Sequence, residues 1–417
     1  MMVRPGGVHG RLGVVGALCI VGALALPTMA PAAINSPIPG GEYSGETNRG
    51  RDVVIEVATD SADGVIEGTF RMPCGGYAEA FEVDEADGSF DVHGKNARGK
   101  TMLKAEGRFL DLERAEGAVK KVRSKRGACK KGSYEAMAEG HEQIERATVS
   151  YGPYDIHPSS GGHHGGGGNI GDRIDPPCED CFVVGMDPDL VHEDGSSANH
   201  ATNAMLHHTV LFNRDDRDTT CTSWAERFFA SGNERTDFVI PRGYGYEIES
   251  GDRWRTLTHL MNTGHEMQRL AVEIEFYFVQ APADIEPVRP MWLDINNCGN
   301  SEYSIPAGES DTHRNFQVTP ELEGRLVSIG GHVHNDGIRI ELTNQTRGES
   351  ICNSVAGYGT IPEYMGNIES MTGCSGDPLA LLDAGDTLRL HSIYDSPGPQ
   401  HDVMGIMVGY VDTEAAP

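Results

Sequence analysis

Hydrophobic and aromatic residues are scarce in this 417-residue chain, at 38% and 7% of the sequence. Turn-forming residues are plentiful instead, with 53 glycines and 22 prolines. No stretch shows long amphipathic periodicity, which excludes a helix bundle and favours an all-β fold of many short strands. Positive charge is scarce as well, with 34 lysines and arginines against 62 acidic residues and a formal net charge of −28. Such a surface repels phosphate backbones and disfavours nucleic-acid binding.

Lysine is missing from most of the chain. All eight lysines lie between Lys95 and Lys131, and every later cationic side chain is arginine or histidine. Fourteen of the 17 histidines lie after residue 150. The two parts therefore indicate separate modules under different constraints.

Long apolar runs are also missing, with one exception near the N-terminus. Leu12–Leu26 follows Arg4 and Arg11 and precedes small residues at Ala30, Ala32 and Ala33. This order predicts a secretory signal over residues 1–33, and the alternative is an uncleaved anchor. We therefore expect a secreted, periplasmic or cell-surface protein with no membrane span after cleavage.

Eight cysteines follow this segment, and an even count in an exported chain predicts disulfides. Cys74 and Cys129 are alone in the N-terminal module, so we expect them to pair. The remaining six are expected to pair within the His-rich part. Cys178 and Cys181 have CxxC spacing, for which a structural disulfide is favoured over a redox or zinc site.

Short alternating runs separated by turns continue along the whole chain. They predict a small N-terminal β-sandwich or barrel over residues 48–150 and a Gly/Pro/His-rich linker over 151–177. Two further β-sandwiches are expected over 178–285 and 286–417. The division between them is expected near the proline-rich stretch at 281–290. The connection over 215–236 is expected to include a short helix near 224–230.

Common catalytic motifs are absent: there is no phosphate-binding loop, GxSxG or HExxH, which weakens the nucleotide-dependent, α/β-hydrolase and zincin interpretations. Three histidine patterns stand out instead. His332 and His334 form HxH, and on a strand residues i and i+2 point to the same face, so two imidazoles can bind one ion. His207 and His208 are adjacent and share an ion only where the strand is distorted. His259 lies in an apolar run, where a core histidine is the default.

Several imidazoles without an acidic cage or a thiolate cluster favour copper or zinc over calcium or magnesium. A thioether ligand favours Cu(I), and Met404 lies in a late apolar strand. The alternative is that this methionine is a core residue.

The order of these motifs resembles the copper type II, ascorbate-dependent monooxygenases, the group of peptidylglycine α-hydroxylating monooxygenase and dopamine β-monooxygenase. The resemblance spans more than half of the chain, through LHHTVLFN (206–213), THLMN (258–262), GGHVHNDGIRIEL (330–342), IYDSP (393–397) and the strand that starts at Met404. It implies two jelly-roll-like β-sandwiches that each carry one copper.

The resemblance also implies a ligand set and a reaction. One copper would be held by His207, His208 and His259 and transfer electrons. The other would be held by His332, His334 and Met404 and bind O₂. The implied reaction is hydroxylation of a C–H bond of a small organic substrate by O₂, with an external reductant such as ascorbate.

The chain departs from the family's pattern at two positions. Gly330 stands where peptide-amidating members have an arginine that anchors a substrate carboxylate, and Gly405 stands where they have a cysteine. Met407 is an alternative thioether, and His391 and His401 are additional imidazoles near the second site. A non-catalytic copper carrier is the alternative function, and a surface β-sandwich interaction protein that binds zinc or no metal is a third.

Overall fold

The computed structural model describes residues 36–61, 65–84, 87–124, 127–140, 143–158 and 170–414. Within these ranges the chain forms strands and a few 3-10 turns such as Pro73–Gly75, and no α-helix. The expected all-β fold is confirmed. The expected signal over residues 1–33 lies outside the described residues. None of the described segments forms a helix with the length and apolar character needed to cross a bilayer.

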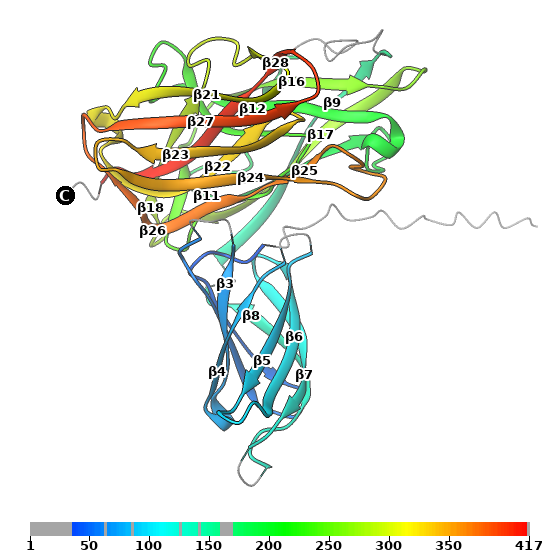
Figure 1. Cartoon of the computed structure of the whole chain (residues 1–417), viewed down its shortest axis with the longest axis vertical. Coiled ribbons are helices and arrows are strands. Elements are labelled where there is room, and N and C mark those ends of the chain that lie inside the picture. Colours follow the sequence, from blue (N-terminus) through cyan, green and yellow to red (C-terminus); the bar gives the residue numbers. More distant parts are fainter. Residues whose placement is uncertain are drawn as a thin grey trace, which may run out of the picture.

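The N-terminal unit is a barrel-like sheet of eight antiparallel strands, drawn in blue and cyan in Figure 1. The strands are β1 (Glu42–Thr47), β2 (Asp52–Val57), β3 (Glu67–Met72), β4 (Tyr77–Glu82), β5 (Ser89–Lys95), β6 (Thr101–Asp111), β7 (Arg114–Val122) and β8 (Gly132–Ala138). A bridge between Val83 and Phe90 brings the two edge strands β4 and β5 together. Buried side chains such as Ile55, Phe70 and Phe109 fill the interior, so this barrel has a packed core.

The first sandwich packs a six-stranded sheet against a four-stranded sheet over one core. The larger sheet contains β9 (Ile144–Ile156), β11 (Cys181–His192), β14 (Phe238–Val239), β15 (Tyr244–Ile248), β17 (Gln268–Gln280) and β18 (Glu286–Pro287). The smaller one contains β10 (Arg173–Ile174), β12 (Ala204–Arg217), β13 (Ala225–Gly232) and β16 (Trp254–Asn262).

Strand β9 lies where the sequence placed the end of the N-terminal unit and the start of the linker. It pairs with β17 from Gln268↔Ile156 to Val279↔Ile144. Tyr151 and Ile156 are buried in the core of the first sandwich, and this burial holds the strand there. The first sandwich therefore recruits residues from before the glycine-rich segment.

The helix expected near residues 224–230 is wrong, because this segment is the strand β13, which pairs with β12. Phe228 packs in the core of the first sandwich, whereas Ala230 packs against the second sandwich. A strand covered on both faces lacks polar–apolar alternation, so its sequence resembles a buried helix.

The second sandwich packs a four-stranded sheet against a five-stranded one. The first of these contains β19 (Arg289–Asp294), β22 (Gly324–Val333), β26 (Gly373–Leu382) and β29 (Gly405–Asp412). The second contains β21 (Gly308–Gln317), β23 (Gly337–Asn344), β24 (Glu349–Tyr358), β25 (Ile368–Met371) and β27 (Thr387–Ser396). A separate pair is formed by β20 (Tyr303–Ile305) and β28 (Gln400–Val403).

The two sandwiches are joined tightly through their smaller sheets. The disulfide between Cys221 and Cys298 links a loop of the first sandwich to a loop of the second. The Tyr410 hydroxyl donates to the Phe228 carbonyl at 2.6 Å, and the Thr220 hydroxyl donates to the Trp292 carbonyl at 2.7 Å. These contacts fix the relative position of the two sheets that carry the histidines.

The four disulfides agree with the expected pairing. Cys74 bonds to Cys129 within the barrel, as predicted. The other six cysteines pair within the His-rich part, as Cys178–Cys181, Cys221–Cys298 and Cys352–Cys374. Because Cys178 and Cys181 are bonded to each other, their sulfurs are not available as thiolate ligands.

Candidate metal centre

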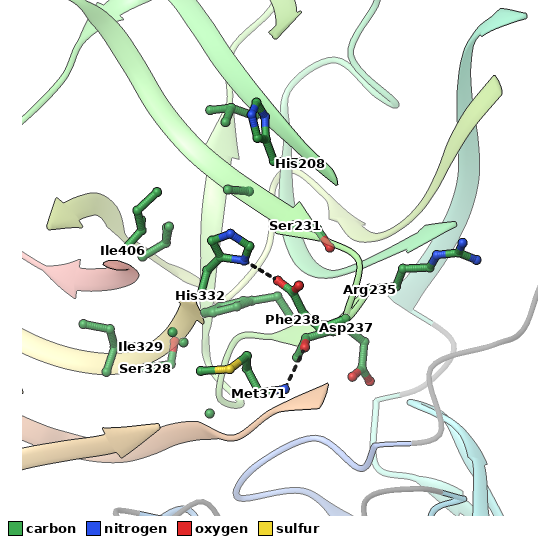
Figure 2. A pocket seen from close by; sticks show the side chains of 18 of the residues that line it. His208, Ser231, Arg235, Asp237, Phe238, Ser328, Ile329, His332, Met371 and Ile406 are labelled. Atoms are coloured by element: carbon green, nitrogen blue, oxygen red, sulfur yellow. Dashed lines mark hydrogen bonds and ion pairs between the residues drawn. The ribbon is translucent and has the colours of Figure 1, made fainter. Parts of the chain in front are cut away.

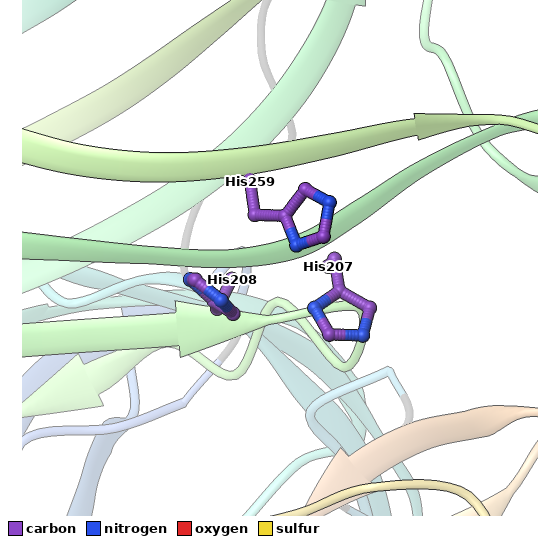
Figure 3. A group of neighbouring side chains, drawn as sticks. All are labelled: His207, His208 and His259. Carbon is purple, nitrogen blue, oxygen red and sulfur yellow. The ribbon is translucent and has the colours of Figure 1, made fainter. Parts of the chain in front are cut away.

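The first histidine group forms where β12 pairs with β16. The pairing advances from Leu206↔Leu260 to His208↔His259, so His207 is the extra residue of a β-bulge. On a regular strand the rings of His207 and His208 would point to opposite faces. The bulge removes this obstacle, and Figure 3 shows both rings beside that of His259.

The geometry of this first group suits a metal ion. One potential ligand atom from each of His207, His208 and His259 lies within 4.8 Å of the other two. The ring centroids of His207 and His259 are 4.7 Å apart, and those of His207 and His208 are 5.2 Å apart. The Nδ1 atoms of His207 and His208 are buried and have no hydrogen-bond partner among the described residues. Buried polar atoms are normally satisfied, so these nitrogens indicate a missing ligand.

The second group lies at the ends of β22 and β29. His332 pairs with Ile406 and Val333 pairs with Gly405, so continuing the register sets His334 opposite Met404. His332 and Met404 both line one cavity, and the ring centroids of His332 and His334 are 5.4 Å apart. The Tyr394 hydroxyl joins them further: it accepts from the His334 backbone N–H at 2.9 Å and donates to the Met404 carbonyl.

The remaining candidates of the sequence lie elsewhere. Met407 pairs with Gly331 and packs, fully buried, in the core of the second sandwich. His391 lies on the outer sheet, 3.4 Å from Asp311 and 3.5 Å from Glu341. His401 on β28 lies 3.1 Å from the Ser304 hydroxyl. None of these three side chains is brought to the histidine groups.

Glu234 is a site residue that lies within the connection predicted over residues 215–236 and that no sequence motif singled out. Its Oε1 lies 2.8 Å from Nδ1 of His332, and both side chains are largely buried. The Nε2 of His332 is buried without a hydrogen-bond partner among the described residues. A carboxylate that holds one ring nitrogen leaves the other directed at a metal. No local signal marks this contact, because 98 residues separate the partners.

The two histidine groups adjoin. The ring centroids of His207 and His334 are 4.7 Å apart, as close as those of His207 and His259. Gly232 on β13 pairs with His208, and a Cβ at this position would lie 2.6 Å from Cε1 of His332. The five imidazoles therefore form one cluster at the interface of the two sandwiches.

The protonation of His207 and His208 suits metal binding, because burial keeps their rings neutral. Burial, and then the neighbouring rings of His259 and His332, lower the pKa of His208 to about 3. Burial and the ring of His334 lower the pKa of His207 even further. Burial also lowers the pKa of His332, but the charge and hydrogen bond of Glu234 outweigh it and raise the pKa above its ordinary value. A neutral imidazole is the form that binds a metal.

The donor set fits copper. It combines imidazole nitrogens with the thioether of Met404 in the wall of one cavity, and the carboxylate of Glu234 holds a ring nitrogen of His332. Calcium and magnesium require oxygen ligands, whereas imidazole and thioether suit copper. A cavity of about 700 Å³ opens beside this cluster and is lined by His208, His332 and Met404.

Comparisons with known proteins point in the same direction. The chain is 28% identical over 295 residues to the probable copper-dependent oxygenase M1 of Phoma sp., covering 66% of this chain and 74% of that protein. It is 26% identical over 248 residues to the probable copper-dependent oxygenase clz3 of Cochliobolus lunatus, covering 56% and 80% respectively. No family model matches the chain.

The similarity to solved structures is weak. The major capsid protein P2 of bacteriophage PM2 is 10% identical with a TM-score of 0.30, and the alignment covers 64% of this chain and 97% of that chain. The capsid protein of STIV is 12% identical with a TM-score of 0.28, covering 64% and 97%. These values support no argument about this chain.

Proposed function

We propose that this protein is a copper-dependent oxygenase. The cluster of five imidazoles at the interface of the two sandwiches is the observation that carries the proposal. The two similar proteins named as probable copper-dependent oxygenases support the same class. The resemblance to the ascorbate-dependent monooxygenases supplies the finer assignment.

Two copper ions would be held by the chain. His207, His208 and His259 would hold one, and His332, His334 and Met404 would hold the other. Copper supplies one-electron transfer and activation of O₂ when bound. The protein contributes the geometry of the ligands: the bulge at His207 directs two adjacent rings to one point, and Glu234 fixes the ring of His332.

The proposed reaction is hydroxylation of a C–H bond. One oxygen atom of O₂ enters the product as a hydroxyl group, and the other leaves as water. Two electrons and two protons come from an external reductant such as ascorbate. Apolar side chains such as Trp292, Ile406 and Val408 line the cavity beside the cluster, and they exclude water from the reacting carbon.

Export to an oxidising compartment belongs to the same proposal. The described part of the chain holds four disulfides, and such bonds persist outside the reducing cytosol. The N-terminal sequence pattern supports a signal peptide.

The experiment combines copper loading with oxygen consumption. The purified chain is loaded with Cu(I), and O₂ uptake is followed with ascorbate and a panel of organic substrates. We expect substrate-dependent uptake that disappears when copper is removed by a chelator. Retained copper without turnover across the panel would favour the copper carrier. Failure to retain copper would contradict both functions.

A further inference from the structure

The cavity beside the histidine cluster has walls from all three folded units. His208 and Ala230 come from the first sandwich, and His332 and Met404 come from the second. Ile66, in the loop between β2 and β3 of the barrel, lines the same cavity, together with Ser61 of that loop and Pro39 before β1. Figure 2 shows part of this cavity and labels His208, Ser231, Phe238 and His332 among the side chains that line it. The barrel is thus part of the cavity wall.

Hydrogen bonds fix the rim of the barrel in this position. The Ser61 backbone N–H donates to the Ser375 carbonyl at 2.9 Å, and the two hydroxyls are 2.9 Å apart. The Ser375 hydroxyl also donates to the Thr59 carbonyl at 2.8 Å. On the other side, the Arg242 backbone N–H donates to the Pro39 carbonyl at 3.0 Å. These bonds link the barrel to both sandwiches, so its rim is a fixed wall.

Gly330 leaves space in the wall of the cavity. It lies on β22, two residues before His332, and lines the cavity. A Cβ at Gly330 would meet only the Phe238 ring, at 3.4 and 3.6 Å. The backbone therefore accepts a larger residue at position 330, but the side chain of that residue would occupy part of the cavity. The glycine keeps this part of the cavity open.

The chemistry of the walls selects an uncharged ligand. Apolar groups such as Phe238, Ile329 and Met371 line the cavity. The hydroxyls of Ser231 and Ser328 also belong to this wall; they are at least nine-tenths buried and have no hydrogen-bond partner among the described residues. Polar atoms buried in this way indicate a ligand with polar oxygens.

Several charged groups of the wall are already compensated or close to their own kind. Arg227 is paired with Asp218 at 2.6 Å, and Arg235 is paired with Asp189. Burial, and then the charge of Asp237, raise the pKa of Asp187 well above its ordinary value, which disfavours the charged carboxylate. Arginines paired in this way give an anionic ligand no free positive charge, and a carboxyl driven toward its neutral form gives a cationic ligand little attraction.

We infer that this cavity binds an uncharged, largely apolar organic substrate with hydroxyl or carbonyl oxygens, and that the N-terminal barrel forms its far wall and limits its size. The inference rests on the proposed function, because it places the reacting carbon beside His332 and Met404. It assigns a role in substrate selection to a unit that carries no catalytic motif of its own.

The test measures binding of the neutral dye Nile red to the copper-loaded full chain. We expect saturable binding of one dye per chain. Gly330→Leu fills the cavity from strand β22, and Ile66→Trp fills it from the barrel, so each should weaken binding at least tenfold. Displacement tests the ligand class: 1-octanol should displace the dye at least tenfold better than octanoate or octylammonium.

Matched controls are available on the same chain. Gly398→Leu introduces the same side chain where no heavy atom lies within 4 Å of the new Cβ, and Val65→Trp changes an exposed neighbour of Ile66. Both should bind the dye like the wild type. The inference is overturned if the wild type does not bind the dye, if neither cavity variant weakens binding, or if a charged competitor displaces the dye as well as octanol.

Copper retention is measured on the same samples. If the chain binds the dye as expected but retains no copper, the inference about the cavity stands and the proposed oxygenase function is contradicted. If the chain retains copper but does not bind the dye, the inference about the cavity is contradicted and the proposed function stands. The two failures are therefore distinguishable.

Discussion

His332 is the ligand whose orientation depends most clearly on a single neighbour. Glu234 lies 2.8 Å from its Nδ1 and holds the ring with Nε2 directed into the cluster. Partners of this kind typically change metal affinity by roughly 10–100-fold when removed. The same dependence is expected here.

We predict that Glu234→Gln lowers the affinity for Cu(I) by roughly 10–100-fold, because the amide does not hold the ring as the carboxylate does. A competition titration with bicinchoninate measures this affinity. Glu369→Gln is the matched control, since Glu369 lines the same cavity. Equal affinity in wild type and Glu234→Gln would contradict the positioning role.

Glu226 makes folding depend on pH. Burial, and then the charge of Asp216, raise the pKa of Glu226 from 4.5 to about 7, although Tyr246 and Arg289 oppose the shift. A carboxyl with a raised pKa in the folded state contributes stability at low pH. This contribution is lost as the pH rises from about 4.5 through about 7.

We predict that Glu226→Gln becomes more stable relative to the wild type between pH 5 and pH 8, by up to about 3 kcal/mol, because glutamine does not titrate. Urea denaturation at both pH values measures the difference. Glu145→Gln, at an exposed position, should show no such trend. If the difference in unfolding free energy between wild type and variant is the same at both pH values, the raised pKa of Glu226 is refuted.

At the scale of elements, β13 contacts both histidine groups. Its last residue, Gly232, pairs with His208 and lies against His332. Because a Cβ would lie 2.6 Å from both His332 Cε1 and Glu234 Oε2, only glycine fits without displacing them. The strand thus sets how close the groups come.

We predict that Gly232→Ala displaces the His332 ring and weakens the copper held by His332, His334 and Met404, while the other copper remains. Copper content after desalting should fall by about half. Gly398→Ala, with open space around its Cβ, should retain the full content. Full copper retention in Gly232→Ala would contradict the prediction, because it would show that the copper site tolerates the added Cβ.

Much of the element structure could be predicted from the sequence. The alternating runs correctly indicated strands throughout, and the isolated pair Cys74 and Cys129 correctly indicated a disulfide. Strand β13 was missed because both of its faces are covered, which removes alternation. Strand β9 was misplaced because its partner β17 lies more than 100 residues further along the chain.

The site could be predicted only in part, for a related reason. Residue type and spacing singled out the histidine motifs, and the resemblance to the copper monooxygenases implied the set of six ligands, whose assignment stays a prediction. The bulge at His207 depends on how β12 pairs with β16. The contact of Glu234 with His332 and the approach of His207 to His334 depend on how the sandwiches dock. Such long-range contacts leave no local pattern.

At the scale of the whole molecule, the docking of the two sandwiches assembles the cluster. The disulfide between Cys221 and Cys298 closes a separation of 77 residues across this interface. Loss of a disulfide of this kind typically costs about 2–4 kcal/mol. The stability of the interface and the integrity of the cluster should therefore change together.

We predict that replacing both Cys221 and Cys298 by serine lowers the thermal midpoint and also lowers copper retention, because the two ligand-bearing sheets separate more easily. Calorimetry and copper analysis of the same sample measure the two effects. Replacing Cys74 and Cys129 by serine is the control, since it should destabilise the barrel and leave copper retention intact. Equal copper loss in both double variants would contradict the local role of the interface disulfide.

The most direct test of the central claim is the copper content per chain of matched histidine variants. After Cu(I) loading and desalting, the account predicts two ions in the wild type and in the control His391→Ala/His401→Ala. It predicts the loss of at least one ion in His207→Ala/His259→Ala and in His332→Ala/His334→Ala. A wild type without copper, or the same content in all four proteins, would contradict it.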